Sequence, residues 1–149
     1  MRVVVGACLL GLAMIGAASA AEVHTCDQAE SSAAYLAEPW ETNTRRFADG
    51  DVRLAVLDLV EPAAGAFHLL VLSPPFDDFD HATCQVVSFA NDLGYREMSL
   101  DGMRVDYDPA QGLIFEIPVS TGAETHDKGA LFLTLNQATG ELQAEDIGT

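Results

Sequence analysis

From Thr42 onward, the chain alternates apolar and polar residues in short runs that are separated by turn residues. A period of two is typical of β-strands with one buried face, because successive side chains point to opposite sides of a sheet. The pattern predicts strands over residues 42–48, 52–59, 67–73, 84–89 and 95–100, with further strands toward the C-terminus. The run 67–73 is apolar on both faces, so we expect it at the centre of a sheet, ending at Pro74-Pro75.

Turns in the second half of the chain define how these strands should pair. A two-residue turn at Asp101-Gly102, a loop over residues 108–112 and a loop over residues 137–140 each set a register. The registers predict the pairs Leu100–Met103, Met98–Val105, Tyr107–Leu113, Val105–Phe115, Leu135–Leu142 and Leu133–Ala144, with Arg104 opposite Glu116 on the other face. Because independent turns place the apolar residues on one face, the sequence indicates an antiparallel meander.

The segment before the strands has a helical pattern. Asp27 and Glu30 have the spacing of a capping box, apolar residues recur at helical spacing up to Ala37, and Pro39 ends the run. We expect one short helix here, with Trp40 packed where the helix meets the sheet. The predicted fold class is mainly β (β-rich α+β): an antiparallel meander of about eight to nine strands forming a barrel or sandwich, with one short N-terminal helix.

The first twenty residues have the pattern of a secretory signal peptide. A basic start at Arg2 is followed by an apolar run and by the small-residue site Ala18-Ser19-Ala20. We expect cleavage before Ala21 and export to the periplasm or extracellular space, which leaves one domain over residues 21–149 that does not span the membrane. Lipidation at Cys8 and an uncleaved anchor are the alternatives.

Two cysteines, Cys26 and Cys84, remain after that cleavage. In an oxidising compartment an even pair is expected to form a disulfide, which here would fasten the N-terminal segment to the sheet. Two free thiols or a redox pair are the alternatives, although the sequence has no C-x-x-C motif.

The mature chain carries six basic side chains against 23 acidic ones, a formal net charge of −17. Such a charge repels nucleic acid and anionic lipid, so neither is expected as a partner. An acidic surface also keeps a protein in solution without any further role, and the acids Glu141, Glu145 and Asp146 near the C-terminus are expected to be solvated. No motif indicates a cofactor.

Three of the six mature cations, Arg45, Arg46 and Arg53, fall on the hairpin around residues 49–50. A two-residue turn places Arg46 opposite Arg53, which is unfavourable unless something neutralises the two charges. The neighbouring acids Glu41, Asp49 and Asp51 are one candidate. The alternative is that the three arginines bind an anionic ligand, because a guanidinium fork fits a carboxylate or phosphate. We take them as the candidate ligand-binding residues.

Catalytic and metal-binding signals are weak. There is no nucleophile elbow, and the four histidines are scattered; His68 is expected on a sheet face. The acidic loop Asp77, Asp78, Asp80 and His81 lacks a calcium-loop pattern, so we predict no catalytic or metal site. In the same loop, Phe76 and Phe79 are expected to fold back over the end of the sheet rather than form a protein-contact rim.

The sequence therefore favours a small exported binding module that contacts an unknown protein or small ligand in the cell envelope, without enzymatic activity. A barrel would offer an apolar cavity for a small ligand, whereas exposed loops suit a protein partner. The alternatives are a metal-assisted hydrolase that uses the Asp77–His81 loop and a structural envelope component. The oligomeric state is left open.

Overall fold

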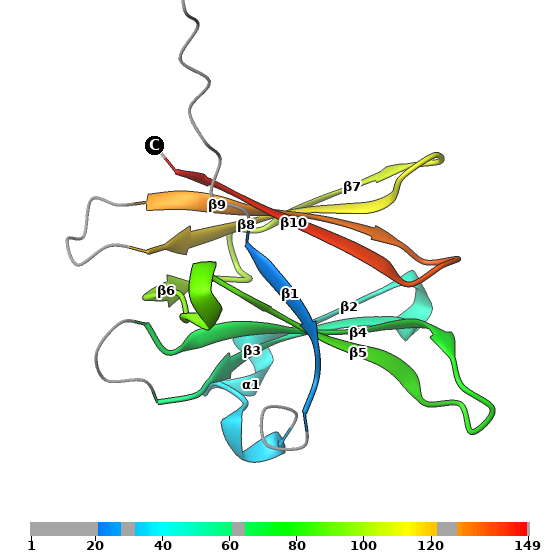
Figure 1. Cartoon of the computed structure of the whole chain (residues 1–149), viewed down its shortest axis with the longest axis horizontal. Helices are drawn as coiled ribbons and strands as arrows, with labels where there is room; N and C mark the ends of the chain where they lie inside the picture. Colours follow the sequence, from blue (N-terminus) through cyan, green and yellow to red (C-terminus); the bar gives the residue numbers. More distant parts are fainter. Residues whose placement is uncertain (1–20, 28–31, 61–64, 122–127, 149) are drawn as a thin grey trace, which may run out of the picture.

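Two antiparallel sheets lie face to face in the computed structural model, which describes residues 21–27, 32–60, 65–121 and 128–148 (Figure 1). The first sheet has the strand order β1-β5-β4-β3-β2. Its strands are β1 (Glu22–Thr25), β2 (Thr44–Phe47), β3 (Val52–Asp58), β4 (Phe67–Phe76) and β5 (Ala82–Ser88). The predicted mainly β class is confirmed, and β4 occupies the predicted central position.

The second sheet has the order β10-β9-β8-β6, with β7 also paired to β8. Its strands are β6 (Glu97–Met98), β7 (Arg104–Asp108), β8 (Gly112–Ser120), β9 (Lys128–Asn136) and β10 (Glu141–Gly148). The helical elements are α1 (Trp40–Asn43) and the 3₁₀ turns η1 (Ala33–Tyr35), η2 (Ala48–Gly50) and η3 (Ala90–Asp92). Among the described residues, no helix has the length and hydrophobicity needed to span a membrane.

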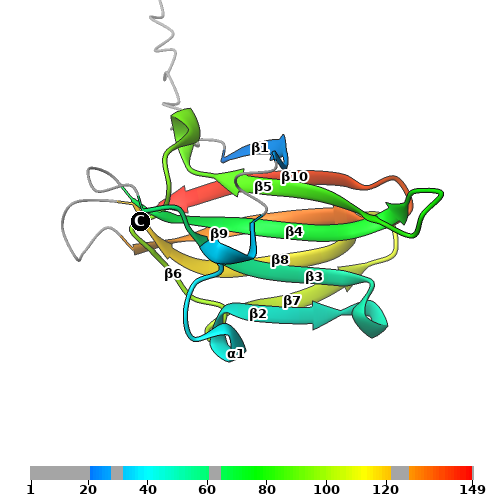
Figure 2. The ribbon, with the colours of Figure 1, turned by 90° about the horizontal axis from the view of Figure 1, so that it is seen from below.

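The alternating pattern of the sequence is the reason that the two sheets pack. Inward-facing side chains of both layers form one core, which includes Leu54, Val56, Leu69, Val71, Phe115, Ile117, Leu131 and Leu133. Figure 2 shows the strands of the two layers running in similar directions, as in an aligned sandwich. Of the two predicted architectures, the sandwich fits, because the sheets do not close into a barrel.

Several predicted registers are confirmed. Tyr107 pairs with Leu113, Leu135 with Leu142, and Leu133 with Ala144. On the outer face, Arg104 lies opposite Glu116, and their charged groups are 3.4 Å apart. These hairpins are local, so turn chemistry and strand periodicity were sufficient to predict them.

The predicted hairpin at Asp101-Gly102 is wrong. β6 pairs with β8 rather than with β7, and Met98 lies opposite Val119. If the register of β6 continued along β8, residue 101 would lie opposite Glu116. Arg104 occupies that position instead, so the chain between β6 and β7 contains three extra residues, which form a bulge on this edge of β8. An odd insertion keeps the same side chains facing inward as a two-residue turn does, and Met98 still packs in the core.

The predicted N-terminal helix is also wrong over the described residues, although Glu30 and part of the segment lie outside them. Only the short η1 turn forms there, and Leu36 is extended. The predicted helix was to end at Pro39, whereas α1 begins directly after Pro39. Trp40 is half exposed instead of packed against the sheet. β4 likewise continues beyond Pro74-Pro75, with a register shift between Ser73 and Phe76.

A second, smaller core lies on the outer face of the first sheet. Leu57, Leu70 and their neighbours there are packed by a segment that we call the strap (residues 32–38). The disulfide between Cys26 and Cys84 is confirmed, with the two Cα atoms 5.5 Å apart, and it joins the chain just before this segment to β5. The predicted signal peptide, residues 1–20, lies outside the described residues.

Candidate functional site

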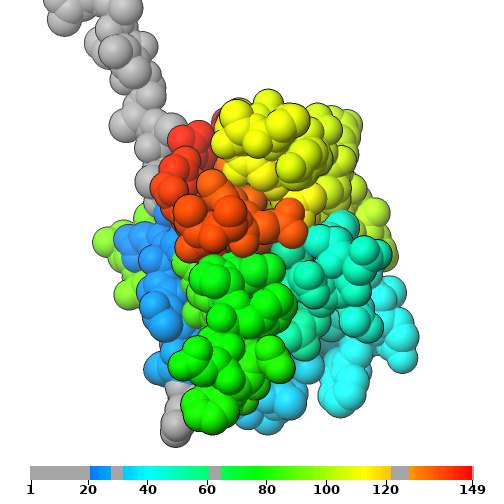
Figure 3. Space-filling view, turned by 90° about the vertical axis from the view of Figure 1, so that its right-hand side faces the viewer, coloured from blue at the N-terminus to red at the C-terminus, as the bar shows by residue number. Residues whose placement is uncertain are grey.

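The candidate basic cluster lies on the β2–β3 hairpin, whose register is the predicted one: Arg46 opposes Arg53. Figure 3 looks onto the end of the sandwich where this hairpin turns, beside the turns that join β4 to β5, β7 to β8 and β9 to β10. The turn itself is the short η2 element, in which Gly50 has a φ of 101°. That conformation favours glycine, which accounts for the Asp-Gly signal in the sequence.

The structure divides the three arginines between the two faces of the sheet. Arg45 lies opposite Leu54 of the inner core, whereas Arg46 and Arg53 are exposed on the outer face. Strand alternation dictates this division, because neighbouring residues on a strand point to opposite sides.

Arg45 is fully engaged in structural contacts. Its Nη1 donates hydrogen bonds to the backbone carbonyls of Glu41, Thr42 and Thr44, at 3.2, 3.0 and 2.7 Å. Its Nη2 pairs with Asp101, between β6 and β7, at 2.5 Å. The side chain therefore ties the edge of the first sheet to the β6–β7 bulge, and little of it remains for a ligand.

The Arg46–Arg53 pair has a different environment. Within the described parts of the chain, no carboxylate lies within the 4.0 Å ion-pair distance of either guanidinium. The proposed neutralisation by nearby acids is therefore not made through direct ion pairs. The Arg46 guanidinium lies over Gly50, where a Cβ atom would collide with it.

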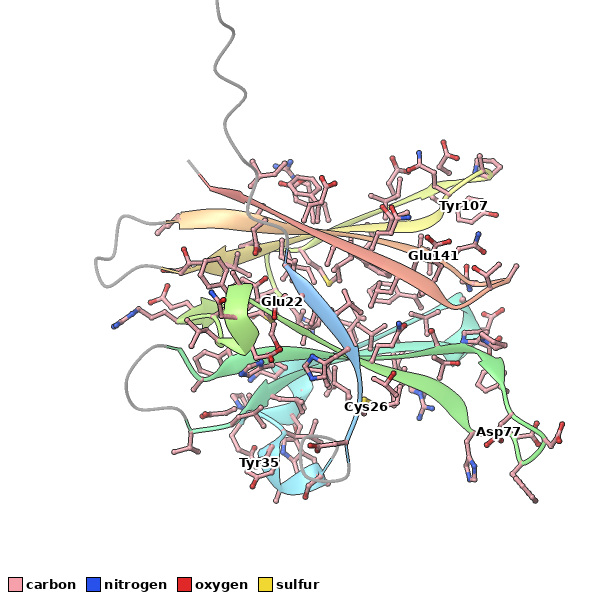
Figure 4. The ribbon with its side chains drawn as sticks, in the orientation of Figure 1. Glu22, Cys26, Tyr35, Asp77, Tyr107 and Glu141 are labelled. Carbon is pink, nitrogen blue, oxygen red and sulfur yellow. A yellow bond between two sulfur atoms is a disulfide. The ribbon has the colours of Figure 1, made fainter. Side chains whose placement is uncertain are left out.

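The acidic loop between β4 and β5 is braced internally (Figure 4). Asp77 Oδ1 accepts hydrogen bonds from the backbone N–H groups of His81 and Phe79, at 2.9 and 2.8 Å, and its Oδ2 lies 3.1 Å from His81 Nδ1. These backbone donors lower the pKa of Asp77 below its ordinary value. In the described residues, no three His, Cys, Asp or Glu side chains are grouped so that they could hold a metal ion.

The two phenylalanines of this loop do not fold back as expected. Phe79 is 79% exposed and Phe76 is 41% exposed. Pro75 makes the contact with the opposite layer instead, because it packs closely against Gly140 of the β9–β10 turn.

His68 occupies the predicted sheet-face position. It is buried, and its Nδ1 lies 2.9 Å from the hydroxyl of Ser88. This geometry positions the ring structurally within the first sheet.

A buried Tyr95–Asp146 pair was missed by the sequence analysis, which placed Asp146 in solvent. Tyr95 is 0% exposed and Asp146 8% exposed, and the Tyr95 hydroxyl donates to Asp146 Oδ1 at 2.8 Å. Burial raises the pKa of Asp146, and the hydrogen bond from Tyr95 opposes that rise. The signal was present, because Asp146 follows Leu142 and Ala144 at a spacing of two on the inward face of β10.

A pocket beside the strap was also missed. It has a volume of about 490 Å³, and its lining includes Tyr35, Glu38, Asp58, Phe67 and Met98. These residues come from the strap, β3, β4 and β6, so no single stretch of sequence contains the pattern.

No family model, curated protein or solved structure matches this chain. A functional interpretation therefore depends on the geometry of these groups.

Proposed function

We propose that this protein is an exported binding module that recognises an anionic group, on a protein or small ligand of the cell envelope, through Arg46 and Arg53. The observation that carries the proposal is their opposition across two paired strands without a carboxylate partner among the described residues. Like charges at directly opposed strand positions are unfavourable, and a bound anion relieves their repulsion. Each fork also offers paired donors to carboxylate or phosphate oxygens.

The hairpin that carries the pair is held firmly, which supports a binding role. On the inner face, Phe47 meets Phe115 of the second sheet with ring centroids 5.1 Å apart, and Arg45 pairs with Asp101. Both contacts fix the edge strand β2 on the inner face of the sheet, opposite to the face that carries Arg46 and Arg53. A site fixed in this way loses little conformational freedom when a ligand binds.

The chemistry of arginine favours holding a ligand over transforming it. A guanidinium stays protonated at physiological pH, so neither Arg46 nor Arg53 acts as a general acid or base. The strong net negative charge, −16 for the whole chain, repels anions that lack a specific fit. A basic pair on such a surface therefore favours selective over general anion binding.

Calorimetric titration with pyrophosphate and with citrate tests the proposal on the disulfide-bonded protein recovered after expression of the full chain. The variants are Arg46→Ala, Arg53→Ala and the double variant. Because a hydrogen bond to a charged group contributes about 1.5–3 kcal/mol, each single variant is expected to lower affinity by about tenfold or more. Binding should also weaken with added salt.

Arg104→Ala is the matched control, because Arg104 is also an exposed strand arginine, with 80% of its side chain accessible. It removes the same charge at a position away from the hairpin. Equal loss of affinity in the control and the hairpin variants, or unchanged affinity in the double variant, would refute the proposal.

A further inference from the structure

The pocket beside the strap combines an apolar wall with a rim of acceptor groups. Its volume of about 490 Å³ is of the size that holds small organic ligands in other proteins. Figure 4 labels Tyr35, which contributes to the lining from the strap side. The pocket lies at the opposite end of β3 from the basic hairpin, because β3 begins beside the turn and ends at Asp58.

Two segments cover the edge of β3 one after the other, and the pocket lies beside the second of them. The partner strand β2 begins at Thr44 and covers only the first part of β3. Farther along, the strap meets β3 through one bridge between Leu36 and Leu57 and one hydrogen bond, 2.9 Å long, from the Ala37 N–H to the Val56 carbonyl. Residues of the strap and Asn43 of α1 both line the pocket.

The lining contains two carboxylates, those of Glu38 and Asp58. Neither Glu38 nor Asp58 has a cationic partner within 4.0 Å among the described residues. One Asp58 oxygen accepts the Val60 N–H at 3.2 Å. Asn43 donates one of its two amide N–H groups to the Pro39 carbonyl at 3.2 Å. Two carboxylates without a cationic partner favour a ligand that brings N–H groups and positive charge.

The apolar part of the lining fits the rest of such a ligand. Phe67 and Met98 contribute hydrophobic surface, and the lining includes two aromatic residues, Tyr35 and Phe67, a residue type whose ring face attracts cations. The acidic surface of the whole chain raises the local concentration of cations.

We propose that this pocket binds a small organic cation with an apolar body, such as an arylalkyl ammonium ion. Its ammonium group pairs with the carboxylates of Glu38 and Asp58, and its body lies against Phe67 and Met98. This site is distinct from the anion site on the hairpin and does not depend on it.

Three probes of similar size test the charge requirement: 2-phenylethylammonium, 2-phenylethanol and 3-phenylpropionate. Calorimetric titration of the disulfide-bonded protein should detect the ammonium ion, with the neutral alcohol at least about tenfold weaker and the carboxylate without measurable binding. Protein NMR of the methionine methyl groups should show the Met98 signal shifting with the ammonium ion. Equal binding of the alcohol and the ammonium ion would overturn the proposal, as would absence of ammonium binding at millimolar concentration.

Variants locate the site. Asp58→Asn keeps an oxygen for the Val60 N–H while it removes one charge, and Glu38→Gln removes the other charge at an exposed position. Each should weaken ammonium binding by about fivefold or more. Asp106→Asn, an exposed acid on β7 outside the pocket lining, removes the same charge and should leave affinity unchanged. If Asp106→Asn weakens binding as much as the pocket variants do, the attraction is general and the proposal fails. If Asp58→Asn does not fold, Glu38→Gln alone decides between these outcomes.

Discussion

Replacing Tyr95 by Phe removes one hydroxyl from the interior of the sandwich and leaves the Asp146 carboxyl without its donor. Both residues are buried, and their hydrogen bond is 2.8 Å long. The second carboxyl oxygen, Oδ2, is buried with no hydrogen-bond partner among the described residues. The Tyr95 hydroxyl is therefore the hydrogen-bond donor that stabilises this buried carboxyl group.

The size of the effect follows from the chemistry of the pair. A hydrogen bond to a charged group contributes about 1.5–3 kcal/mol, so Tyr95→Phe should lower the free energy of unfolding at pH 7 by that amount. With a urea slope of about 1.5 kcal/mol per M, a loss of about 2 kcal/mol lowers the unfolding midpoint by about 1.3 M. Urea unfolding followed by circular dichroism measures it.

The pH dependence has a definite sign. Burial raises the pKa of Asp146 in the folded state above its ordinary value, so the folded state holds this proton more tightly than the unfolded state does. That contribution to stability is fully present below the ordinary aspartate pKa and is lost as pH rises through the raised one. Removing the Tyr95 donor raises the folded pKa further, so the variant should lose more stability at pH 7 than at pH 4.

Asp146→Asn provides the control for this reasoning. An amide side chain at this position keeps an oxygen that accepts the Tyr95 hydroxyl, but it does not titrate. In that background, Tyr95→Phe should cost less, and the extra loss at pH 7 should disappear. An equal loss at both pH values, or the same loss in the Asp146→Asn background as in the wild-type chain, would refute the role assigned to the buried charge.

Three further predictions concern other parts of the chain. Replacing Cys26 and Cys84 by Ser should lower the free energy of unfolding by about 4 kcal/mol, because the disulfide closes a loop with a sequence separation of 58; a loss below about 1 kcal/mol in urea would contradict this. The intact mass of the protein recovered from its native host should match a chain that begins at Ala21. A mass that includes residues 1–20 or an attached lipid would contradict the predicted cleavage. Arg45→Ala should lower the urea midpoint, because it breaks contacts between elements, whereas Arg46→Ala should change stability by about 0.5 kcal/mol or less; equal effects would refute the division of their roles.

The hairpins were predictable because their determinants are local. The loop over residues 108–112 fixes Tyr107 opposite Leu113, and the alternation on both sides agrees with that register. The disulfide was predictable for a different reason, since the predicted removal of residues 1–20 leaves two cysteines, which allow one pairing. The opposition of Arg46 and Arg53 followed from the Asp-Gly turn alone.

The failures arose where distant contacts override a local pattern. Alanines at helical spacing favour a helix, but the bridge between Leu36 and Leu57 and the disulfide at Cys26 hold this segment against a sheet. The Asp101-Gly102 pair is compatible with either a hairpin or a bulge, because both arrangements point the same side chains of the flanking strands toward the core. Only the pairing of Met98 with β8, and not with the nearer strand β7, distinguishes the bulge from the hairpin.

The separation of the two candidate sites also follows from the topology. β3 carries Arg53 near its first residue and Asp58 at its last, so a single strand of about 20 Å connects the arginine pair with the pocket that contains two carboxylates. Sequence alone shows the arginine cluster, because one hairpin contains it. It does not show the pocket, because Glu38, Phe67 and Met98 meet there only after the two sheets pack and the strap is fastened. Evidence for an anion site is therefore local, whereas evidence for a cation site depends on the tertiary fold.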